Sequence, residues 1–467
     1  MVRPSRIFGT LAVCLIARAS AADEPVGARE PHLMSESAEV TSVVDAFDKD
    51  DPFDLNLVVG FTQSWKHANV RRESLSTSGF VSANQDIAQY SSATSTLLVG
   101  ADVGLYRDLA LILRVPVILS YSQDLQDLNG SSATAAQALV DPSDPMGRPL
   151  FSVPFTSPTR SGVDYLSAGL DWDVFNQQRD PTKPTWVVGV EGRLAVGTPL
   201  HACNAGATPQ CPDPSNPTGP SRDPGISRGM DAIVARSVWS RRFGYVEPYA
   251  GIWVQAEFPQ ERSDFGKWDA ANIVDRSPPV LGSFALGVEV LPYEQREQFQ
   301  RLSADFRFKG TYHSPGRDYS ELFDALGSSQ AASLRTPNPA SYIAGPDGRS
   351  IADPNAEKIY FSGITEEQAY GSFTASASAT WQAGAYIKFT IGGSFSYAQS
   401  HLVTAADPCN PNNTSLALAG PCVNASTGAV QGAPNPDHRD VIDAPGRRFS
   451  IDDTTTVDLW VLGVVMF

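Results

Sequence analysis

The chain has 467 residues, of which 42% are hydrophobic, and its formal net charge is −16. This acidic balance excludes a nucleic-acid surface, because phosphate binding needs clustered Lys and Arg side chains. Beyond the N-terminal apolar stretch, no segment approaches the roughly 18 apolar residues that a spanning helix needs, which excludes a bundle of membrane helices.

The N-terminus has the pattern of an export signal. Arg3 and Arg6 precede the apolar stretch "IFGTLAVCLIA", and the small residues of "ARASAADEP" follow it. This order predicts a cleavable signal peptide over residues 1–21. Cys14 leaves a lipid-anchored alternative open, although Val13 occupies a position where lipoprotein signals need a small residue.

Residues 22–54 are acidic and have no sustained apolar period, which predicts a solvated tail. Within it, "DAFDKDDPFD" raises the alternative of a calcium site. The stretch lacks the glycine at its sixth position and the closing glutamate of an EF-hand loop. We therefore expect no metal and no cofactor here.

From residue 55 onward, apolar and polar residues alternate with the period of two that is typical of strands. In "RLSADFRFKGTYH", residues 301–313, one phase is apolar and the other is charged or hydroxylated; the apolar phase holds Leu302, Ala304, Phe306, Phe308 and Tyr312. Twelve such segments are predicted at about 55–68, 90–106, 109–123, 162–177, 185–198, 230–242, 245–258, 279–292, 301–314, 370–382, 385–401 and 454–467. In the segment 230–242 the phases of Ile233, Val234 and Val238 do not separate cleanly.

The connections between these segments alternate in length. Short turns are predicted near residues 107–108, 178–183, 242–244, 292–300 and 383–384. Long stretches rich in Ser, Gly, Pro and Asn lie near 70–89, 124–161, 199–229, 259–278, 315–369 and 402–453. A compact soluble domain rarely has several long loops without structure, whereas a barrel that crosses a membrane has tight turns on one rim and long loops on the other.

The chain ends on "VDLWVLGVVMF", in which one phase holds Val457, Leu459, Val461, Gly463, Val465 and Phe467. This segment resembles the C-terminal strand of Gram-negative outer-membrane β-barrel proteins, whose terminal Phe belongs to the signal read by the barrel-assembly machinery. The resemblance implies an all-β fold, an antiparallel transmembrane β-barrel of about 12 strands over residues 55–467. It also implies an outer-membrane location, a periplasmic tail and turns, long loops at the cell surface, and outer-membrane lipid and the assembly machinery as partners. Val461, Val465 and Phe467 are the candidate assembly signal.

The phase opposite the apolar one is predicted to line the barrel interior. It collects Asp102, Arg114, Asp171, Asp173, Glu191, Arg193, Arg236, Glu247, Glu257, Glu289, Asp305, Arg307, Lys309 and Lys388. An Arg or Lys on the lipid face at mid-depth would cost about 2–4 kcal/mol, so their common phase supports a barrel. Acids and bases on neighbouring strands are expected to compensate one another.

Two functional interpretations of this interior stay open. The charges line a water-filled pore for small polar solutes, as charged rings do in channels, or they pair into a network that fills the interior. The first predicts a passive pore or uptake channel. The second leaves a structural or adhesive barrel that acts through its loops. In the loop 315–369, helical spacing over residues 317–334 is compatible with a short helix that enters the mouth or lies over the rim.

Four cysteines remain after the signal peptide, and they form two close pairs. Cys203 pairs with Cys211, and Cys409 with Cys422, in loop-type sequence. An exported chain meets an oxidising compartment, which favours two local disulfides. Metal binding would need CxxC spacing with nearby His, which neither pair has.

An outer-membrane enzyme is the remaining alternative. His67 and His313 lie near the outer ends of predicted strands, where barrel enzymes often place their sites, but their surroundings match no catalytic motif. His32, His201, His401 and His438 fall in the tail, in loops or at a strand edge. We therefore expect a protein that is not an enzyme.

Overall fold

The computed structural model describes residues 37–46, 54–75, 81–130, 132–141, 144–265, 277–346, 350–411 and 415–467. The predicted signal peptide, the lipid-anchor alternative at Cys14 and most of the calcium-like stretch lie outside these residues. Within the described ranges, no helix has the length and apolar character needed to cross a membrane.

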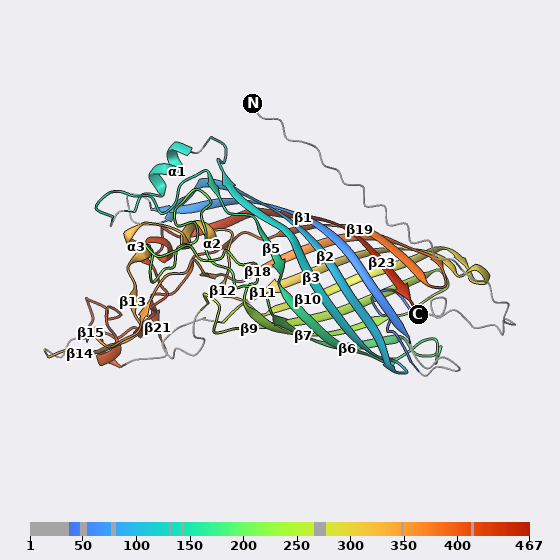
Figure 1. Ribbon diagram of the computed structural model, residues 1–467. Coiled ribbons are helices and arrows are strands. Elements are labelled where there is room, and N and C mark those ends of the chain that lie inside the picture. Colours follow the sequence, from blue (N-terminus) through green and yellow to red (C-terminus); the bar gives the residue numbers. More distant parts are fainter. Residues whose placement is uncertain are drawn as a thin grey trace, which may run out of the picture.

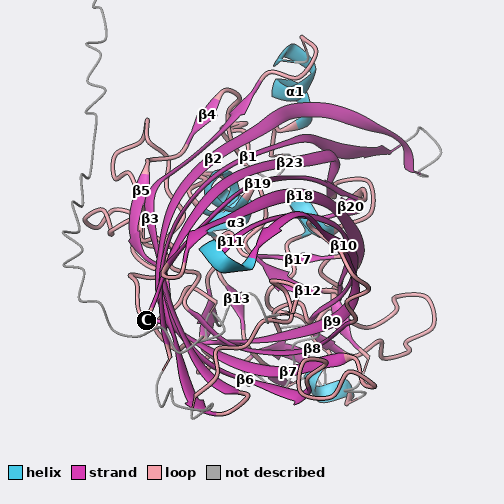
Figure 2. Ribbon diagram, turned by 90° about the vertical axis from the view of Figure 1, so that its right-hand side faces the viewer, coloured by secondary structure: helices cyan, strands magenta, loops and turns pink. Residues whose placement is uncertain are grey.

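Twelve long antiparallel strands form a closed barrel (Figures 1 and 2). In order around the wall they are β1 (Leu55–Leu75), β2 (Val81–Tyr106), β3 (Leu109–Gln126), β6 (Tyr165–Phe175), β7 (Thr185–Ala195), β8 (Met230–Ser240), β9 (Val246–Pro259), β10 (Leu281–Gln295), β11 (Gln300–His313), β18 (Tyr370–Gly384), β19 (Ile387–Ala398) and β23 (Phe449–Met466). The barrel closes where β1 pairs with β23, for example Leu57 opposite Val465. Closure leaves no unpaired edge in the wall.

The prediction of an antiparallel barrel of about 12 strands is confirmed, because each predicted segment coincides with one strand of the wall. The boundaries differ most at the long-loop end. β2 has 26 residues and β1 has 21, so both extend well beyond the predicted segments. Their extensions pair with each other, Ser74 opposite Ala83, so the prediction of a long loop over 70–89 is wrong for most of that stretch, which is strand.

Exposure alternates along the strands as the sequence period predicts. In β6, Leu170 and Trp172 are 48% and 55% exposed, whereas Asp171 and Asp173 are 4% and 6% exposed. β8 resolves the ambiguous segment, since Ile233 is 53% exposed and Val238 is fully buried. Apolar side chains therefore cover the outside of the wall and polar side chains cover the inside.

The long loops fold into compact structure at one end of the barrel, on the left in Figure 1. They contain the helices α1 (Ser132–Ala138), α2 (Phe323–Gly327), α3 (Ala332–Arg335) and α4 (Asp440–Asp443), and the short helices η2 (Arg296–Gln298) and η3 (Leu416–Leu418) lie in a turn and a loop. Their short strands are β4 (Phe155–Thr156), β5 (Arg160–Val163), β12 (Gly316–Asp318), β13 (Asn338–Pro339), β14 (Tyr342–Ala344), β15 (Ser350–Ala352), β16 (Lys358–Ile359), β17 (Thr365–Glu367), β20 (His401–Leu402), β21 (Cys409–Asn410) and β22 (Ala433–Pro434). We call this assembly of loops the cap.

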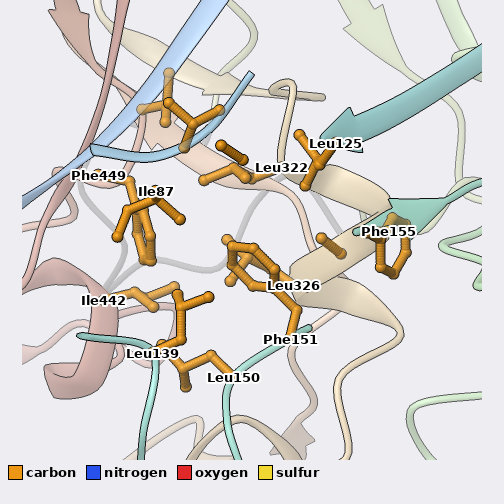
Figure 3. Close-up of a cluster of buried hydrophobic side chains, with 14 of the residues drawn as sticks. Ile87, Leu125, Leu139, Leu150, Phe151, Phe155, Leu322, Leu326, Ile442 and Phe449 are labelled. Carbon is orange, nitrogen blue, oxygen red and sulfur yellow. The ribbon is translucent and has the colours of Figure 1, made fainter. Parts of the chain in front are cut away.

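The largest apolar core of the described residues lies in the cap and the strand extensions (Figure 3). Ile87 of β2, Leu150 of the second long loop, Leu326 of α2, Ile442 of α4 and Phe449 of β23 all belong to it, and none is more than 1% exposed. Segments that are distant in sequence thus converge on one core. Burial of these side chains, at about 1.5–3 kcal/mol each, is what holds the loops in a single arrangement.

Candidate functional site in the barrel interior

The fourteen residues predicted to line the interior lie on the inner phase of their strands. β11 shows this directly, because Phe306 and Phe308 are 54% and 45% exposed on the outside while Arg307, between them, bonds inward to Tyr249. The same inner phase holds Asp102, Arg114, Asp171, Asp173, Glu191, Arg193, Arg236, Glu247, Glu257, Glu289, Asp305, Lys309 and Lys388. The interior wall is therefore polar and charged.

Most of these charges form ion pairs. The pairs are Arg114 with Asp102 at 2.6 Å, Arg193 with Glu191 at 2.8 Å, Arg228 with Glu257 at 3.0 Å, Arg301 with Glu289 at 3.2 Å, Arg307 with Asp305 at 3.5 Å, and Arg236 with Asp171. The last pair reaches across β7, and Gly189 makes this possible, since a Cβ there would lie 2.0 Å from the Asp171 Oδ1. Two of these pairs join neighbouring strands, Arg114 with Asp102 and Arg301 with Glu289, whereas Arg193 with Glu191 and Arg307 with Asp305 lie within one strand. Local charge compensation is thus the main pattern of the interior.

Three members of the predicted set have no partner of opposite charge among the described residues. Asp173 accepts a hydrogen bond only from the Asn176 side chain, at 3.2 Å. The Glu247 carboxylate accepts one from the Ser240 hydroxyl at 2.6 Å, and its second oxygen has none. The Lys309 ammonium of β11 has neither a hydrogen bond nor an ion pair with any residue that the structure describes. At these three positions no neighbouring side chain within the described ranges forms an ion pair that would compensate the charge.

Residues 37–46 cross the interior near the short turns. The Glu39 carboxylate accepts hydrogen bonds from the Lys388 ammonium at 3.0 and 2.8 Å, and its backbone N–H donates to Glu289 at 2.9 Å. The Thr41 hydroxyl shares a hydrogen bond with the Ser240 hydroxyl at 2.8 Å. Nothing in the sequence analysis anticipated these contacts within the predicted tail, since a single acidic residue without a period carries no signal for them.

The far end of this segment reaches the turn between β2 and β3. Ala46 and Arg107 exchange backbone hydrogen bonds of 3.0 and 2.7 Å. The segment therefore spans the barrel, from the side of β8, β10 and β19 to that of β2. We call residues 37–46 the N-terminal crosspiece.

A cavity of about 330 Å³ lies between the crosspiece and the wall. Glu39 and Val40 of the crosspiece form one side of it. The other side consists of wall residues from β8, β9, β10 and β11, namely Arg236, Trp253, Ala285, Arg307 and Lys309. Three cationic side chains and one carboxylate thus face the same space.

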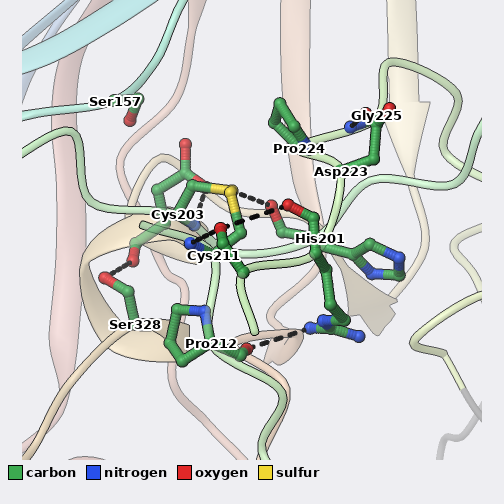
Figure 4. Close-up of a disulfide and its surroundings, with 12 residues drawn as sticks. Ser157, His201, Cys203, Cys211, Pro212, Asp223, Pro224, Gly225 and Ser328 are labelled. Atoms are coloured by element: carbon green, nitrogen blue, oxygen red, sulfur yellow. Dashed lines mark hydrogen bonds between the residues drawn. A yellow bond between two sulfur atoms is a disulfide. The ribbon is translucent and has the colours of Figure 1, made fainter. Parts of the chain in front are cut away.

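The opposite end of the interior is occupied by the cap. All five residues of α2 are buried. Asp324 of α2 receives two hydrogen bonds from Arg160 of β5, at 2.9 and 2.7 Å, and one from the Cys203 N–H at 2.9 Å. Cys203 also forms the disulfide with Cys211, which Figure 4 shows with His201, Pro212 and Ser328 around it. The long loop between β7 and β8 is thereby joined to α2.

The second disulfide joins Cys409 and Cys422 in the last long loop. Both predicted cysteine pairs are therefore bonded as the spacing suggested. The first disulfide contacts α2 at the barrel mouth through the Cys203 N–H. The second lies further out in the cap, beside a pocket of about 600 Å³.

A further cavity, of about 280 Å³, lies beneath α2 and against the walls of β1, β2 and β3. Hydroxyl-bearing side chains dominate its lining; they are Ser64, Tyr90, Ser92, Thr94, Tyr121, Tyr319, Ser320 and Thr456. Lys66 and Glu321 also line it and form an ion pair of 2.6 Å. Burial alone would raise the pKa of Glu321, but the Lys66 ammonium outweighs it and holds that pKa below its usual range. The pair is therefore ionised at neutral pH.

Apolar side chains cover most of the outside of the barrel wall. Aromatic side chains gather near the short turns, where Trp172, Trp239, Tyr245, Tyr386 and Phe467 are 55%, 38%, 67%, 69% and 62% exposed. Water-soluble monomers rarely expose contiguous apolar patches above a few hundred Å², whereas lipid-facing barrels carry an apolar band with aromatic girdles. This chain is an outer-membrane β-barrel protein.

Solved structures similar to this outer-membrane barrel include an outer membrane channel from Pseudomonas putida F1, with a TM-score of 0.37 and 10% identity over 91% of this chain and 100% of that one. A FadL homologue from Pseudomonas aeruginosa matches with a TM-score of 0.30 and 10% identity, covering 88% of this chain and 89% of the other. The outer membrane protease OmpT from Escherichia coli matches with a TM-score of 0.28 and 7% identity, covering 91% and 100%. Similarity at this level carries no information on function. No family model and no curated protein matches the sequence.

The histidines of the barrel form no metal site among the described residues, where no group of three His, Cys, Asp or Glu side chains is placed to hold an ion. His313 stacks on Tyr370 with ring centroids 4.2 Å apart, and Tyr370 stacks on His401 at 3.8 Å. His201 bonds to Asp264 at 2.9 Å and His438 to Asp440 at 2.8 Å.

Several charged residues with contacts described above were missed as candidates, among them Lys66, Arg301 and Glu39. Lys66 and Arg301 have the inner phase of β1 and β11, so a stricter reading of the alternation would have found both. Glu39 lies outside every strand, and no pattern in the sequence marks it.

Proposed function

We propose that the protein is a passive channel that takes up small polar solutes across the outer membrane, with its long loops facing the cell exterior. The observation that carries this proposal is the character of the interior. The described wall is lined by paired charges and hydroxyls around two cavities of about 330 and 280 Å³. A barrel with a purely structural role would be stable with a packed interior, and its wall would need no cavities.

Apolar packing inside the wall is confined to a small region. Among the described residues, one buried apolar cluster consists of wall residues alone, namely Val58, Val464 and Met466 near the short turns. The other two clusters join wall residues such as Met230 to residues of the cap. The large apolar core belongs to the cap instead. The polar interior is therefore suited to hydrated solutes.

The crosspiece and the cap both lie on the route from one rim to the other. Transport requires that at least one of them shifts, and the crosspiece has the weaker attachment, since it is held by a few polar contacts rather than by an apolar core. We therefore propose a channel of low resting conductance that opens when the crosspiece moves.

Planar-bilayer recording on the purified protein tests this function. We expect unitary currents in the wild type. We expect Arg307→Glu to shift the reversal potential toward cation selectivity, because it reverses a charge that faces the cavity beside the crosspiece. Lys183→Glu, in a short turn with its side chain 50% exposed, is the matched control and should leave selectivity unchanged. Absence of current, both in the wild type and after removal of the crosspiece, would overturn the proposal.

A loop-based binding role is the second candidate, because the cap contains its own pocket of about 600 Å³. Tyr342, Asn435, His438 and Arg447 are among its lining residues, and its size falls within the range of ligand pockets, about 300–1,000 Å³. A barrel that acts only through this pocket would carry no current in the same recording.

An enzymatic role has less support. The two His–Asp pairs, His201 with Asp264 and His438 with Asp440, both lie in long loops. Neither imidazole bonds to a serine, threonine or cysteine side chain among the described residues, as a nucleophile–base pair would require.

A further inference from the structure

We infer that the cavity beside the crosspiece binds the carboxylate of a small organic acid, with Lys309 as its principal partner. This inference deepens the proposed function and rests on it in one respect, that the cavity lies on the path of the solute. The binding site itself depends only on the contacts within the cavity.

Lys309 differs from the other basic residues around the cavity. Arg236 is paired with Asp171, Arg307 lies 3.5 Å from Asp305, and Lys388 is paired with Glu39. Of the three basic side chains that line the cavity, Lys309 alone has no ion pair with a carboxylate among the described residues. A charge held away from bulk water is costly unless it is paired, so the cavity favours a guest that carries one negative charge.

The two arginines retain unused donors. Arg307 donates through Nε to the Tyr249 hydroxyl at 2.8 Å, and its distance of 3.5 Å to Asp305 leaves that contact without a hydrogen bond. Arg236 engages Asp171 through Nε and one terminal nitrogen. Each guanidinium has five N–H groups in a planar fork, so both can donate to a carboxylate that Lys309 neutralises.

The rest of the lining is suited to a hydrocarbon group. Trp253 of β9, Ala285 of β10 and Val40 of the crosspiece face the same cavity as the cations. Its volume of about 330 Å³ is at the small end of ligand sites. A cationic side opposite an aromatic and aliphatic side favours a compact organic monocarboxylate over an inorganic anion.

Glu39 lines this cavity and also anchors the crosspiece through Lys388. A bound carboxylate near Lys309 would add a negative charge beside Glu39 and weaken that anchor. Occupation of the site is therefore expected to loosen the crosspiece, which couples solute binding to opening.

Calorimetric titration of the detergent-folded full chain tests the site, with benzoate as the probe and the neutral benzamide as its matched analogue. We expect benzoate to bind at least about tenfold more tightly than benzamide, because charge-assisted hydrogen bonds account for most of the difference. Lys309→Gln should lower the benzoate affinity about tenfold, whereas Lys183→Gln should leave it unchanged. Asp305→Asn removes the carboxylate nearest Arg307 and should raise the benzoate affinity.

Asp305→Asn guards against the possibility that a loss in Lys309→Gln reflects poor folding, because a gain in affinity cannot arise from misfolding. Equal binding of benzoate and benzamide, or benzoate binding that is unchanged in both variants, would overturn the site. Competition by chloride at the same concentration as benzoate would overturn the assignment to an organic acid.

The two proposals fail in different ways. Benzoate binding that depends on Lys309 in a protein without any current supports the site and removes the channel function. Unitary currents in a protein whose benzoate binding ignores Lys309 support the channel and remove the site.

Discussion

Arg160 and Asp324 form a two-pronged ion pair in which both side chains are only 1% exposed. Arg160 belongs to β5, which extends the wall beside β3, and Asp324 belongs to α2 in a loop more than 160 residues later. Gln123 of β3 donates to the same carboxylate at 2.5 Å, and the Cys203 N–H donates at 2.9 Å. One carboxylate thus fixes α2 to two strands and to the loop that carries the first disulfide.

Asp324→Asn should release the cap from the barrel mouth. The substitution leaves Arg160 charged and buried without a carboxylate, and breaking a buried pair in this way costs about 3–5 kcal/mol. We expect faster hydrogen exchange over residues 319–328, measured by mass spectrometry on the folded barrel. Asp440→Asn is the control, because that side chain is 84% exposed, and it should leave exchange unchanged. Equal protection in wild type and Asp324→Asn would show that the apolar core alone holds α2.

The two disulfides should contribute to different properties. Each closes a short loop and is expected to stabilise its surroundings by about 3 kcal/mol in the chain-entropy account. Replacing both Cys203 and Cys211 with Ser should loosen α2, since the Cys203 N–H holds Asp324. Replacing both Cys409 and Cys422 should loosen only the outer part of the cap. Limited proteolysis with identification of the cut sites separates the two, and cuts near α2 in the second variant alone would contradict this division.

The contact between Glu39 and Lys388 is expected to control conductance. Glu39→Lys places two like charges together and should detach the crosspiece, which raises the open probability in planar bilayers. Adding Lys388→Glu restores an opposite-charge pair in reversed order, so the double variant should return toward wild-type conductance. Conductance that rises in Glu39→Lys and stays high in the double variant would mean that the pair itself does not hold the crosspiece.

The alternation of side chains was sufficient to predict the wall. A strand that separates lipid from a polar interior leaves a period of two in every segment, so Phe306 and Arg307 could be assigned to opposite faces from sequence alone. The strand count followed from the same pattern. The barrel was predicted from the alternating loop lengths and from the resemblance of the last strand to those of outer-membrane barrels. The extension of β2 toward Val81 projects beyond the barrel wall, so its two faces no longer separate lipid from a polar interior. The alternation of apolar and polar residues is lost there, and the start of β2 was predicted too late in the chain.

The cap and the crosspiece could not be predicted in this way. Their residues are fixed by single long-range contacts, such as Arg160 with Asp324 or Glu39 with Lys388, and neither contact repeats with any period. The inner phase did identify which charges face the interior. The phase could not identify which of these charges lack an ion pair. Lys309 and Arg307 lie on the same face of β11, and only the folded structure shows that Arg307 lies near a carboxylate, that of Asp305.

The cap is expected to be more stable at mildly acidic pH than at alkaline pH. Burial raises the pKa of Glu366 to about 8, and the nearby Asp443 and Asp437 carboxylates act in the same direction. The Asn435 amide and Arg317 lower this pKa but do not outweigh burial. Burial likewise raises the pKa of Asp443 to about 6. Both groups titrate near pH 4 when unfolded. Between those values the folded state binds more protons, so stability falls as pH rises from about 4 to about 8.

Glu366→Gln should remove part of this dependence, because an amide stays neutral and can still bond to Asn435. The measurement is the melting temperature of the cap at about pH 5 and at about pH 9, which bracket the titration window. Glu357→Gln changes an exposed carboxylate in the same loop and serves as the control. A melting temperature that rises with pH in the wild type would contradict the assignment of Glu366 as protonated.

Phe467 is expected to matter more for assembly of the barrel than for its final stability. Its backbone pairs with Leu55 through hydrogen bonds of 2.9 and 3.2 Å, which the main chain of any residue would make, while its ring is 62% exposed on the outer face. Val461 and Val465, 51% and 40% exposed, continue the same outer stripe. A surface that is presented to lipid in the finished barrel is free to be recognised beforehand by the assembly machinery.

Phe467→Ser should therefore lower the yield of folded barrel in cells, while material refolded in detergent should retain a melting temperature close to that of the wild type. Val464→Thr is the matched control, because Val464 belongs to the inner apolar cluster. Val464→Thr should lower the free energy of unfolding by about 1 kcal/mol, and with it the melting temperature. It should leave assembly in cells unchanged. Heat-modifiable mobility on gels measures the folded fraction in both settings. If Phe467→Ser lowers folding equally in cells and in detergent, the ring acts through packing, and the C-terminal stripe of this chain is a structural element and no assembly signal.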